Sequence, residues 1–233
     1  MNKQQIKHIT NIHYRKIKRH CKEVAENFDA EAIHQLRVEY KKLRAFLRML
    51  SHDNGWAGEI KFSKNLKHGY NVSGAIRDLQ LQEQRILEAT KTETKKPLAY
   101  PHLLQREIDK LKPELIEIFS EDLVAESKKK TDAHLPNEFP VTRFKNFVKQ
   151  KWVAVYAILA SGHFSDDNIH FIRKCLKDLF YNLKIYEGLE HEILSVSIWK
   201  GKDEKYFDTL LNELGDFQDK CIAIALLKSY WLI

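Results

Sequence analysis

The sequence predicts an all-α protein, and three observations support this fold class. Apolar residues recur with the 3.6-residue period of one helix face, and no segment shows the apolar-polar alternation of a half-buried strand. The 233 residues include only 8 Gly and 5 Pro, which is too few for a turn-rich β protein. Hydrophobic residues make up 43% of the chain, enough for a packed core. The sequence is therefore that of a folded, helical protein.

In the first half, residues that start or stop helices separate the periodic segments. Asp29 is a favourable N-cap for the second helix, and SHDNGW after Leu50 ends it. A third helix, beginning near Trp56, is expected to weaken around HGYNVSG, and Pro113 predicts a kink or a restart later on. The expected helices cover residues 3–27, 29–50, 56 to HGYNVSG, 75–90 and 102–127.

A charged segment with two prolines separates the two halves of the chain. Residues 129–140, KKTDAHLPNEFP, are the strongest candidate for a linker. We therefore expect a single domain made of a first helical half, residues 1–128, and a second, residues 141–233. Ser165 is a good N-cap in the second half. The expected helices there cover residues 141–161, 166–187, 201–214 and 216–231.

Two apolar stripes with the same spacing indicate an internal duplication. Both step by 3, 4, 3, 4 and 3 residues, and the second lies 136 residues after the first. GAIRD, beginning at Gly74, has a counterpart in GDFQD, beginning at Gly215, so two landmarks recur in the same order. The stripes are Ile33, Leu36, Tyr40, Leu43, Leu47 and Leu50, and Ile169, Ile172, Leu176, Leu179, Leu183 and Tyr186.

A basic stripe runs beside each apolar stripe. In the first half its members step by 3, 4, 3 and 4 residues, and like charges at this spacing repel one another. A lysine-rich or arginine-rich face of a helix is often simply solvated. Here the stripe borders the core face and is repeated, and an anionic ligand would turn the repulsion into binding energy. The stripes are His34, Arg37, Lys41, Arg44 and Arg48, and His170, Arg173, Lys177 and Lys184.

The net charge of +7 indicates an anionic partner, which could be a nucleic acid, a phosphorylated polymer or an acidic membrane. The polar start MNKQQIKHIT lacks the apolar core of a signal peptide, and the longest apolar run, WVAVYAILA, is too short to span a bilayer. Three widely spaced cysteines without a C-x-x-C pair are typical of reduced core thiols. We therefore expect a cytoplasmic protein.

The helix IHQLRVEYKKLRAFLRML, residues 33–50, resembles the signature helix of the conserved-histidine α-helical domain (CHAD) family. That signature is His-x-x-Arg-Val followed by paired basic residues, a further Arg and an aliphatic tail. SGAIRDLQ resembles the second landmark of the family, and IHFIRKCLKDLFYNLKIY and LGDFQDKC resemble their repeats. The resemblance covers essentially the whole chain.

This resemblance implies two four-helix bundles related by a pseudo-twofold, with a basic central cavity that binds inorganic polyphosphate without catalysis, metal or cofactor. Asp178 and Phe180 replace Lys42 and Arg44 in the second half, so we expect the first half to contribute more of the binding. The residues that match the family motifs are His34, Arg37, Lys41, Lys42, Arg44, His170, Arg173 and Lys177. Further candidates from the charge pattern are Arg48, Arg77, Arg15, Arg19, Lys64 and Arg143.

Two other classes of function remain as alternatives. A nucleic-acid-binding helical protein fits the charge, although most aromatic residues, such as Tyr40, Phe46 and Phe180, lie at apolar-stripe positions where core packing explains them. An enzyme of phosphate metabolism would need a motif that is not seen. The sequence has no Glu-x-Glu-x-Lys segment of a triphosphatase and no P-loop, and HEILS lacks the second His of a zinc site.

Overall fold

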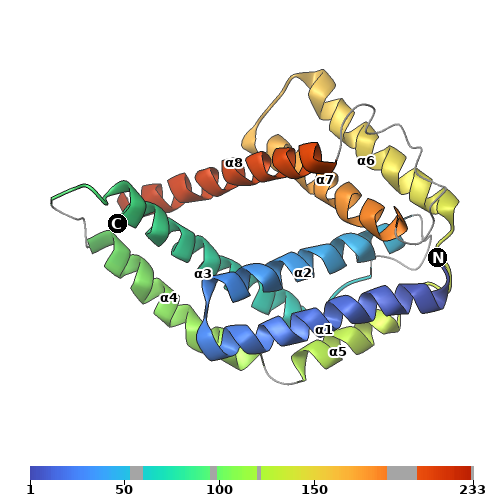
Figure 1. The fold of residues 1–233 in the computed structure, drawn as a ribbon, viewed down its shortest axis with the longest axis horizontal. Coiled ribbons are helices and arrows are strands. Elements are labelled where there is room, and N and C mark those ends of the chain that lie inside the picture. The colour runs from blue at the N-terminus through green and yellow to red at the C-terminus, as the bar shows by residue number, and fades with distance from the viewer. Residues whose placement is uncertain (53–59, 95–98, 120–121, 188–203, 232–233) are drawn as a thin grey trace. The chain divides into compact units, whose positions relative to one another are not determined.

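The computed structural model describes residues 1–52, 60–94, 99–119, 122–187 and 204–231, and this part of the chain is all-helical, as predicted. An isolated bridge between Asn2 and Glu138 is the β-type pairing found there. None of these helices is both long and apolar enough to cross a lipid bilayer. The helices are α1 (Lys3–Asn27), α2 (Ala30–Leu50), α3 (Lys64–Ala89), α4 (Ala99–Ile118), α5 (Leu123–Asp132), α6 (Val141–Ser161), α7 (Asp166–Glu187) and α8 (Glu204–Trp231) (Figure 1).

Side-chain caps fix where several helices begin. The backbone N–H of Ala32 donates to Asp29 Oδ2 over 2.9 Å, and that of Asn168 donates to Ser165 Oγ over 3.3 Å, which confirms both predicted N-caps. A third cap was not predicted: the N–H of Leu66 donates to Ser63 Oγ over 3.2 Å at the start of α3. Each cap satisfies one of the backbone donors that a helix leaves open at its first turn.

The predicted breaks at glycines are wrong, because these glycines allow close packing inside continuous helices. A Cβ atom at Gly69 would lie 2.6 Å from Phe119 Cε1, and α3 runs through HGYNVSG without interruption. Gly215 likewise lies inside α8, which is one helix where two were expected. The expected start of a helix near Trp56 falls outside the described residues. In the described part, α3 begins at Lys64.

The segment expected to be helical over residues 102–127 contains two helices. Pro113 lies inside α4, which continues to Ile118, so the helix does not restart at the proline. The second helix, α5, extends to Asp132 and includes the first four residues of the predicted linker. The stretch between α5 and α6 is therefore only residues 133–140.

The chain forms two compact units, and these do not coincide with the two halves of the sequence. One unit, here called the α6–α7 unit, contains Met1–Lys3, Arg44–Glu59 and Pro136–Cys221. The other, the α3–α4 unit, contains Gln4–Leu43, Ile60–Leu135 and Ile222–Ile233. The end of α2 is thus assigned to the unit that holds most of the second half, and the end of α8 to the unit that holds most of the first.

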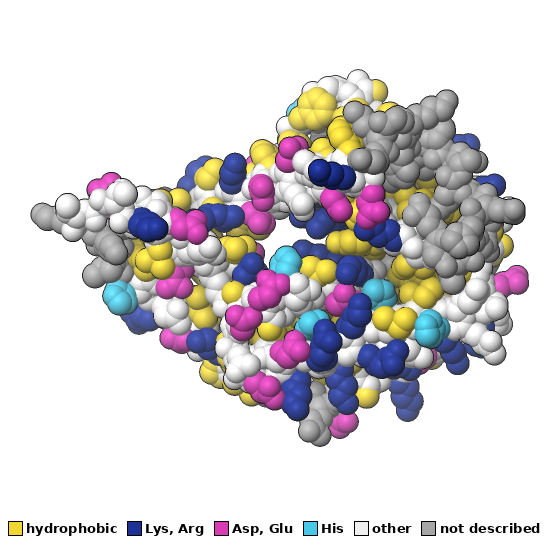
Figure 2. All heavy atoms as spheres, viewed as in Figure 1, with side chains coloured by type: hydrophobic (Ala, Val, Ile, Leu, Met, Phe, Trp, Pro, Cys, Tyr) yellow, Lys and Arg dark blue, Asp and Glu magenta, His cyan; other side chains and the backbone are white. Residues whose placement is uncertain are grey.

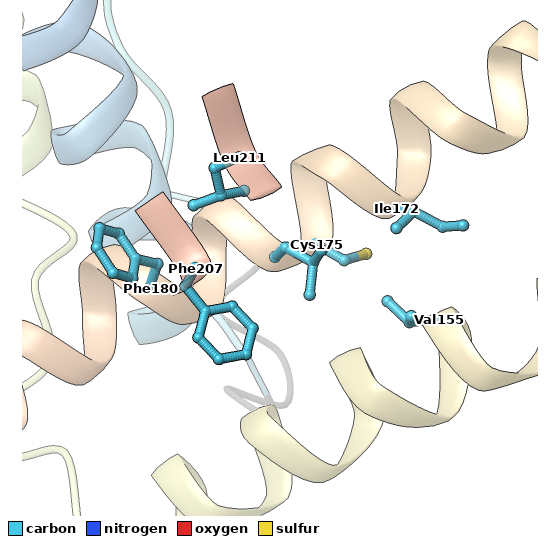
Figure 3. Packing of buried hydrophobic residues seen from close by; sticks show 7 residues of the cluster. Val155, Ile172, Cys175, Phe180, Phe207 and Leu211 are labelled. Atoms are coloured by element: carbon cyan, nitrogen blue, oxygen red, sulfur yellow. The ribbon is translucent and has the colours of Figure 1, made fainter. Parts of the chain in front are cut away.

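In the α6–α7 unit, α6 packs along α7, and the first part of α8 completes the core (Figure 1). The buried cluster in Figure 3 includes Val155 from α6, Cys175 and Phe180 from α7, and Phe207 from α8. The predicted stripe on α7 is buried from Ile172 onward, whereas Ile169 at its start is partly exposed. The apolar pattern therefore identified the core face of α7.

In the α3–α4 unit, α3 packs along α4, and α1 and α5 join the same core. The ring of Tyr40 stacks between Phe62 and Tyr70, with ring centroids 4.3 Å and 4.1 Å away. Tyr14 of α1 hydrogen-bonds Thr131 of α5 over 2.7 Å. Every member of the predicted stripe from Ile33 to Leu50 is buried, including the part of α2 that belongs to the other unit.

The cysteines are only partly as expected. Cys21 and Cys175 are buried free thiols, as predicted for core residues. Cys221 is also a free thiol, but its side chain is partly exposed, so it is not a core thiol.

Candidate functional site

The Arg37 side chain of α2 is held against the glycine of the first landmark. Arg37 Nη1 donates to the Tyr70 carbonyl oxygen over 2.8 Å, and the guanidinium lies over the Tyr70 ring, 4.6 Å from its centre. A Cβ atom at position 74 would lie 2.2 Å from Arg37 Nη1 and 2.9 Å from its Cζ. Only glycine at that position leaves room for the guanidinium, so the two sequence landmarks form one structural contact.

Arg173 of α7 makes the corresponding contact in the α6–α7 unit. A Cβ atom at Gly215 of α8 would lie 2.7 Å from Arg173 Nη2. Arg173 and Gly215 occupy the places in the second half that Arg37 and Gly74 occupy in the first. Both glycines, at which a helix break was predicted, therefore leave room for an arginine side chain to pack closely.

Glu39 is a buried carboxylate within the α3–α4 unit. His13 Nδ1 of α1 lies 2.8 Å from its Oε2, and Lys42 Nζ donates to its Oε1 over 3.0 Å. Burial by itself raises the pKa of Glu39, but hydrogen bonds and charges from His13 and Lys42 outweigh burial and lower that pKa to about 2. Lys42, one of the predicted ligand contacts, is therefore engaged by an acid one turn away on its own helix.

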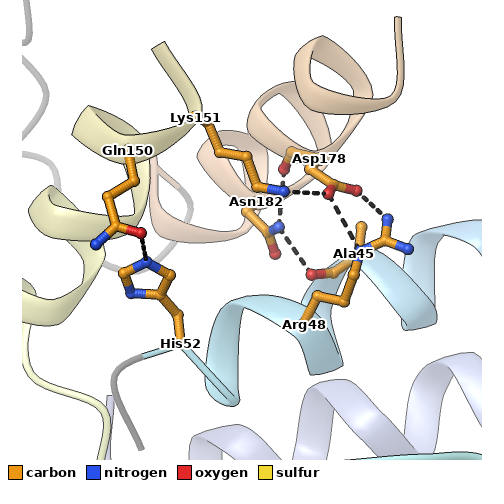
Figure 4. Close-up of polar contacts among 7 residues, drawn as sticks. All are labelled: Ala45, Arg48, His52, Gln150, Lys151, Asp178 and Asn182. Carbon is orange, nitrogen blue, oxygen red and sulfur yellow. Dashed lines mark hydrogen bonds and ion pairs between the residues drawn. The ribbon is translucent and has the colours of Figure 1, made fainter. Parts of the chain in front are cut away.

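Asp178 is the buried carboxylate of the α6–α7 unit (Figure 4). Arg48 Nε donates to Asp178 Oδ2 over 3.1 Å, and Arg48 Nη2 donates to Asp178 Oδ1. Lys151 Nζ of α6 donates to Asp178 Oδ2 over 2.9 Å. One turn further, Asn182 donates to the Ala45 carbonyl over 3.1 Å. These bonds attach the end of α2 to α6 and α7, so the predicted contact Arg48 has a structural partner.

Two further cations of this cluster were not predicted as site residues. Neither Lys151 of α6 nor Lys174 of α7 is among the candidates from the sequence. The pKa of Lys174 is lowered by partial loss of solvent around its ammonium group and by the nearby charges of Arg48, Arg44 and Lys151, against the opposing effect of Asp178. The cluster therefore holds four cations around one carboxylate and retains excess positive charge.

A second group of polar residues links α7 to α8 beside Arg173. His170 Nδ1 lies 2.9 Å from Gln218 Oε1, so the glutamine that replaces the landmark arginine bonds the landmark histidine. Burial, followed by the charge of Arg173, lowers the pKa of Lys177 to about 8, although Asp219 acts in the opposite direction. Asp219 therefore stabilises the charged form of Lys177.

The remaining candidates in the α3–α4 unit lie in different settings. Arg19 pairs with Glu23 over 3.4 Å on the same helix, and Arg15 lines a groove between α1 and α5. Lys64 is the first residue of α3, where a positive charge is opposed by the helix dipole. Arg77 is partly exposed on α3, three residues after the glycine that seats Arg37.

The other four candidates differ in exposure. His34 is exposed on α2, and Lys41 and Arg44 are partly buried on the same helix. Arg143 is partly buried in the first turn of α6. Among the described residues no group of three His, Cys, Asp or Glu side chains could hold a metal ion. The candidate side chains supply hydrogen-bond donors and positive charge, from arginine forks and lysine ammonium groups.

These features define an all-helical protein whose basic helices are braced by glycine contacts and buried carboxylates. The model of the CHAD domain family matches residues 8–228, so the chain belongs to this family. Searches of curated proteins and of solved structures give no significant match.

Proposed function

We propose that this protein binds inorganic polyphosphate through its two basic helices and does not catalyse a reaction on it. The observation that carries the proposal is that an arginine side chain packs closely against a glycine in both units. Arg37 packs against Gly74, and Arg173 packs against Gly215. A guanidinium held in place beforehand loses little conformational entropy when it binds a phosphate. Membership of the CHAD domain family, which is associated with polyphosphate, supports the same assignment.

The chemistry of polyphosphate suits these residues. The polymer is a flexible chain of negative charges with no bases to recognise. Arginine binds phosphate oxygens through its planar fork, whereas lysine acts as a mobile point charge. Binding that depends on charge alone weakens steeply with salt, as it does for nucleic-acid phosphates. We therefore expect a strong dependence on ionic strength.

We further propose the architecture in which polyphosphate is bound. It consists of two four-helix bundles related by a pseudo-twofold, with a basic cavity that the arginines and lysines of α2 and α7 line. The matching stripes and landmarks support the duplication, and the net charge of +7 supports an anionic occupant. The free thiols of Cys21, Cys175 and Cys221 suit a cytoplasmic protein.

The direct test compares two polyanions. Long-chain polyphosphate and single-stranded DNA are titrated into the protein at the same near-physiological salt concentration, and both dissociation constants are measured by calorimetry. Polyphosphate is expected to bind more tightly. Equal or tighter binding of DNA would reject the proposal in favour of a nucleic-acid-binding protein.

The non-catalytic part of the proposal has its own test. The protein is incubated with polyphosphate and a divalent metal ion, and released phosphate is measured over time. No turnover above a protein-free control is expected. Sustained release that is abolished by Arg37→Ala would show that the protein is an enzyme.

A further inference from the structure

A groove lies between α1 and α5 in the α3–α4 unit, apart from the contacts between arginine and glycine that carry the proposed function. Its volume is about 570 Å³, within the range of small-molecule pockets. Both of its walls belong to one unit, and Tyr14 ties them together through hydrogen bonds to Ser127 and Thr131. The lining residues are His8, Asn11, Tyr14, Arg15, Lys18, Val124, Ala125 and Lys128.

The groove lies on the side of α1 that faces away from α2. His13 and Lys16 both approach Glu39 of α2, so they mark the α2-facing side of α1. At about 100° per residue, Arg15 and Lys18 project roughly 130–170° around the helix from the middle of that side. The groove is therefore distinct from the Arg37 contact between α2 and α3.

The rim of the groove is cationic. Arg15 and Lys18 are exposed, and neither forms an ion pair within the part of the chain that the structure describes. Lys128 pairs with Asp132 over 2.5 Å, and His8 adds a titratable group. Figure 2 shows Lys and Arg side chains gathered over α1. This rim has an excess of positive charge for an anionic group to neutralise.

The floor of the groove is apolar, with a buried polar atom beside it. Val124 and the ring of Tyr14 are buried, and Ala125 adds an exposed methyl group. Asn11 Oδ1 is buried and has no hydrogen-bond partner among the described residues. A buried acceptor without a donor is unfavourable, and a ligand N–H would satisfy it. An inorganic polyanion uses neither the apolar floor nor this acceptor.

We propose that the groove binds a nucleotide. The base lies on the floor formed by Tyr14, Val124 and Ala125, with an amino group directed to Asn11 Oδ1. The phosphates extend to the rim, where Arg15, Lys18 and Lys128 bind their oxygens. This arrangement uses every class of residue in the groove, whereas polyphosphate would use only the rim.

The test compares ATP with inorganic triphosphate, which carries the same phosphates without a base. Both are titrated by calorimetry into the full chain in metal-free buffer. Because the base buries apolar surface, ATP is expected to bind about tenfold more tightly than triphosphate. Equal affinities would overturn the proposal, since the floor would then contribute nothing.

Variants locate the site. Arg15→Glu with Lys18→Glu is expected to weaken ATP binding about tenfold or more, because two phosphate contacts become repulsive. The matched control is Lys145→Glu with Lys149→Glu, the same charge change on exposed positions of α6, and it is expected to leave ATP affinity within about twofold. Equal losses in the two variants would show a general effect of charge and overturn the proposal.

A further variant tests the groove without changing the net charge of the protein. Ala125→Trp keeps the net charge and fills the groove from an exposed position, so it is expected to lower ATP affinity while polyphosphate affinity is unchanged. Unchanged ATP affinity would overturn the nucleotide assignment. Arg37→Ala is expected to weaken polyphosphate binding and leave ATP binding intact, so failure of the groove and failure of the proposed function give different results.

Discussion

Helices α2 and α7 carry the same apolar stripe, but they differ in how their charges are balanced. On α2, Lys42 is engaged by Glu39 of the same helix. On α7, the residue at the matching place is Asp178, which takes hydrogen bonds from Arg48 and Lys151 on two other helices. Both helices nevertheless keep the arginine that packs on a landmark glycine. The contact between an arginine and a glycine thus recurs beside both helices, whereas the charge next to it differs.

This difference gives a physical reason to expect that the two halves contribute unequally to the proposed polyphosphate binding. Asp178 both removes a cation from α7 and engages Arg48 and Lys151, so part of the positive charge near α7 is balanced internally. Phe180 replaces a second cation and lies in the core, with Lys184 Nζ 4.2 Å from the centre of its ring. At these two positions the second half thus has a carboxylate that binds the end of α2 and an aromatic ring in the core, where the first half has cations.

The largest expected effect is on stability. Asp178→Asn leaves Arg48 and Lys151 without their buried carboxylate, so the free energy of unfolding is expected to fall by about 3 kcal/mol. Urea denaturation followed by circular dichroism measures the loss. The control is Glu204→Gln, which removes an exposed partner of Lys184 and is expected to cost about 0.5 kcal/mol or less. A loss of unfolding free energy no larger than that of the control would show that the bonds from Arg48 and Lys151 to Asp178 do not stabilise the fold.

The second prediction addresses binding. Arg37→Ala with Arg44→Ala is expected to weaken polyphosphate binding about 30-fold, and Arg173→Ala with Lys177→Ala only about threefold to fivefold, at one fixed salt concentration. The slope of log affinity against log salt should fall by about one per lost phosphate contact. Comparable losses from the two pairs would contradict the unequal contribution, provided that circular dichroism shows all variants to be helical.

The third prediction concerns the two contacts between an arginine and a glycine. Gly74→Ala places a Cβ 2.2 Å from Arg37 Nη1 and 2.9 Å from its Cζ, so the whole guanidinium must leave its position. Gly215→Ala places a Cβ 2.7 Å from Nη2 of Arg173, whereas Cζ and Nε of Arg173 lie 3.5 Å away. Because preorganisation is lost, Gly74→Ala is expected to weaken polyphosphate binding about fivefold, and Gly215→Ala less than twofold.

Stability serves as the control for these glycine variants. Alanine favours a helix by about 0.5–1 kcal/mol over glycine, and the displaced group is the end of a flexible side chain. The free energy of unfolding is therefore expected to change by less than about 1 kcal/mol in either variant. A large loss of stability in Gly74→Ala would show that the guanidinium cannot move aside.

The smallest expected effect concerns pH. The pKa of Lys177 is lowered to about 8, so its charge is lost as the pH rises from about 7 to 9, whereas an ordinary lysine keeps its charge to about pH 10. The contribution of α7 to polyphosphate binding should fall over this range by about twofold, and arginines on α2 stay charged. Between pH 7 and pH 9, calorimetry should show a smaller decrease in polyphosphate affinity for Lys177→Ala than for the unchanged protein. An identical decrease in both would exclude Lys177 as its source.

Several features of the site could be read from residue spacing. The arginine and glycine landmarks were recognised in both halves. The pair of Glu39 with Lys42 was missed, although the spacing of three residues on one helix would have revealed it. In contrast, Lys151 and Asp178 lie on different helices, and nothing local to either residue indicates that they meet.

By itself, the sequence determined the helical class, the buried faces of α2 and α7, and the excess of positive charge. These follow from periodicity and composition, which act over a few turns of helix. Only the tertiary structure decided that arginines pack against Gly74 and Gly215 and that Asp178 binds Arg48. The reason is physical: a glycine next to an empty space and a glycine next to a guanidinium have the same local sequence. Which partner reaches it depends on packing between segments that are far apart in the chain.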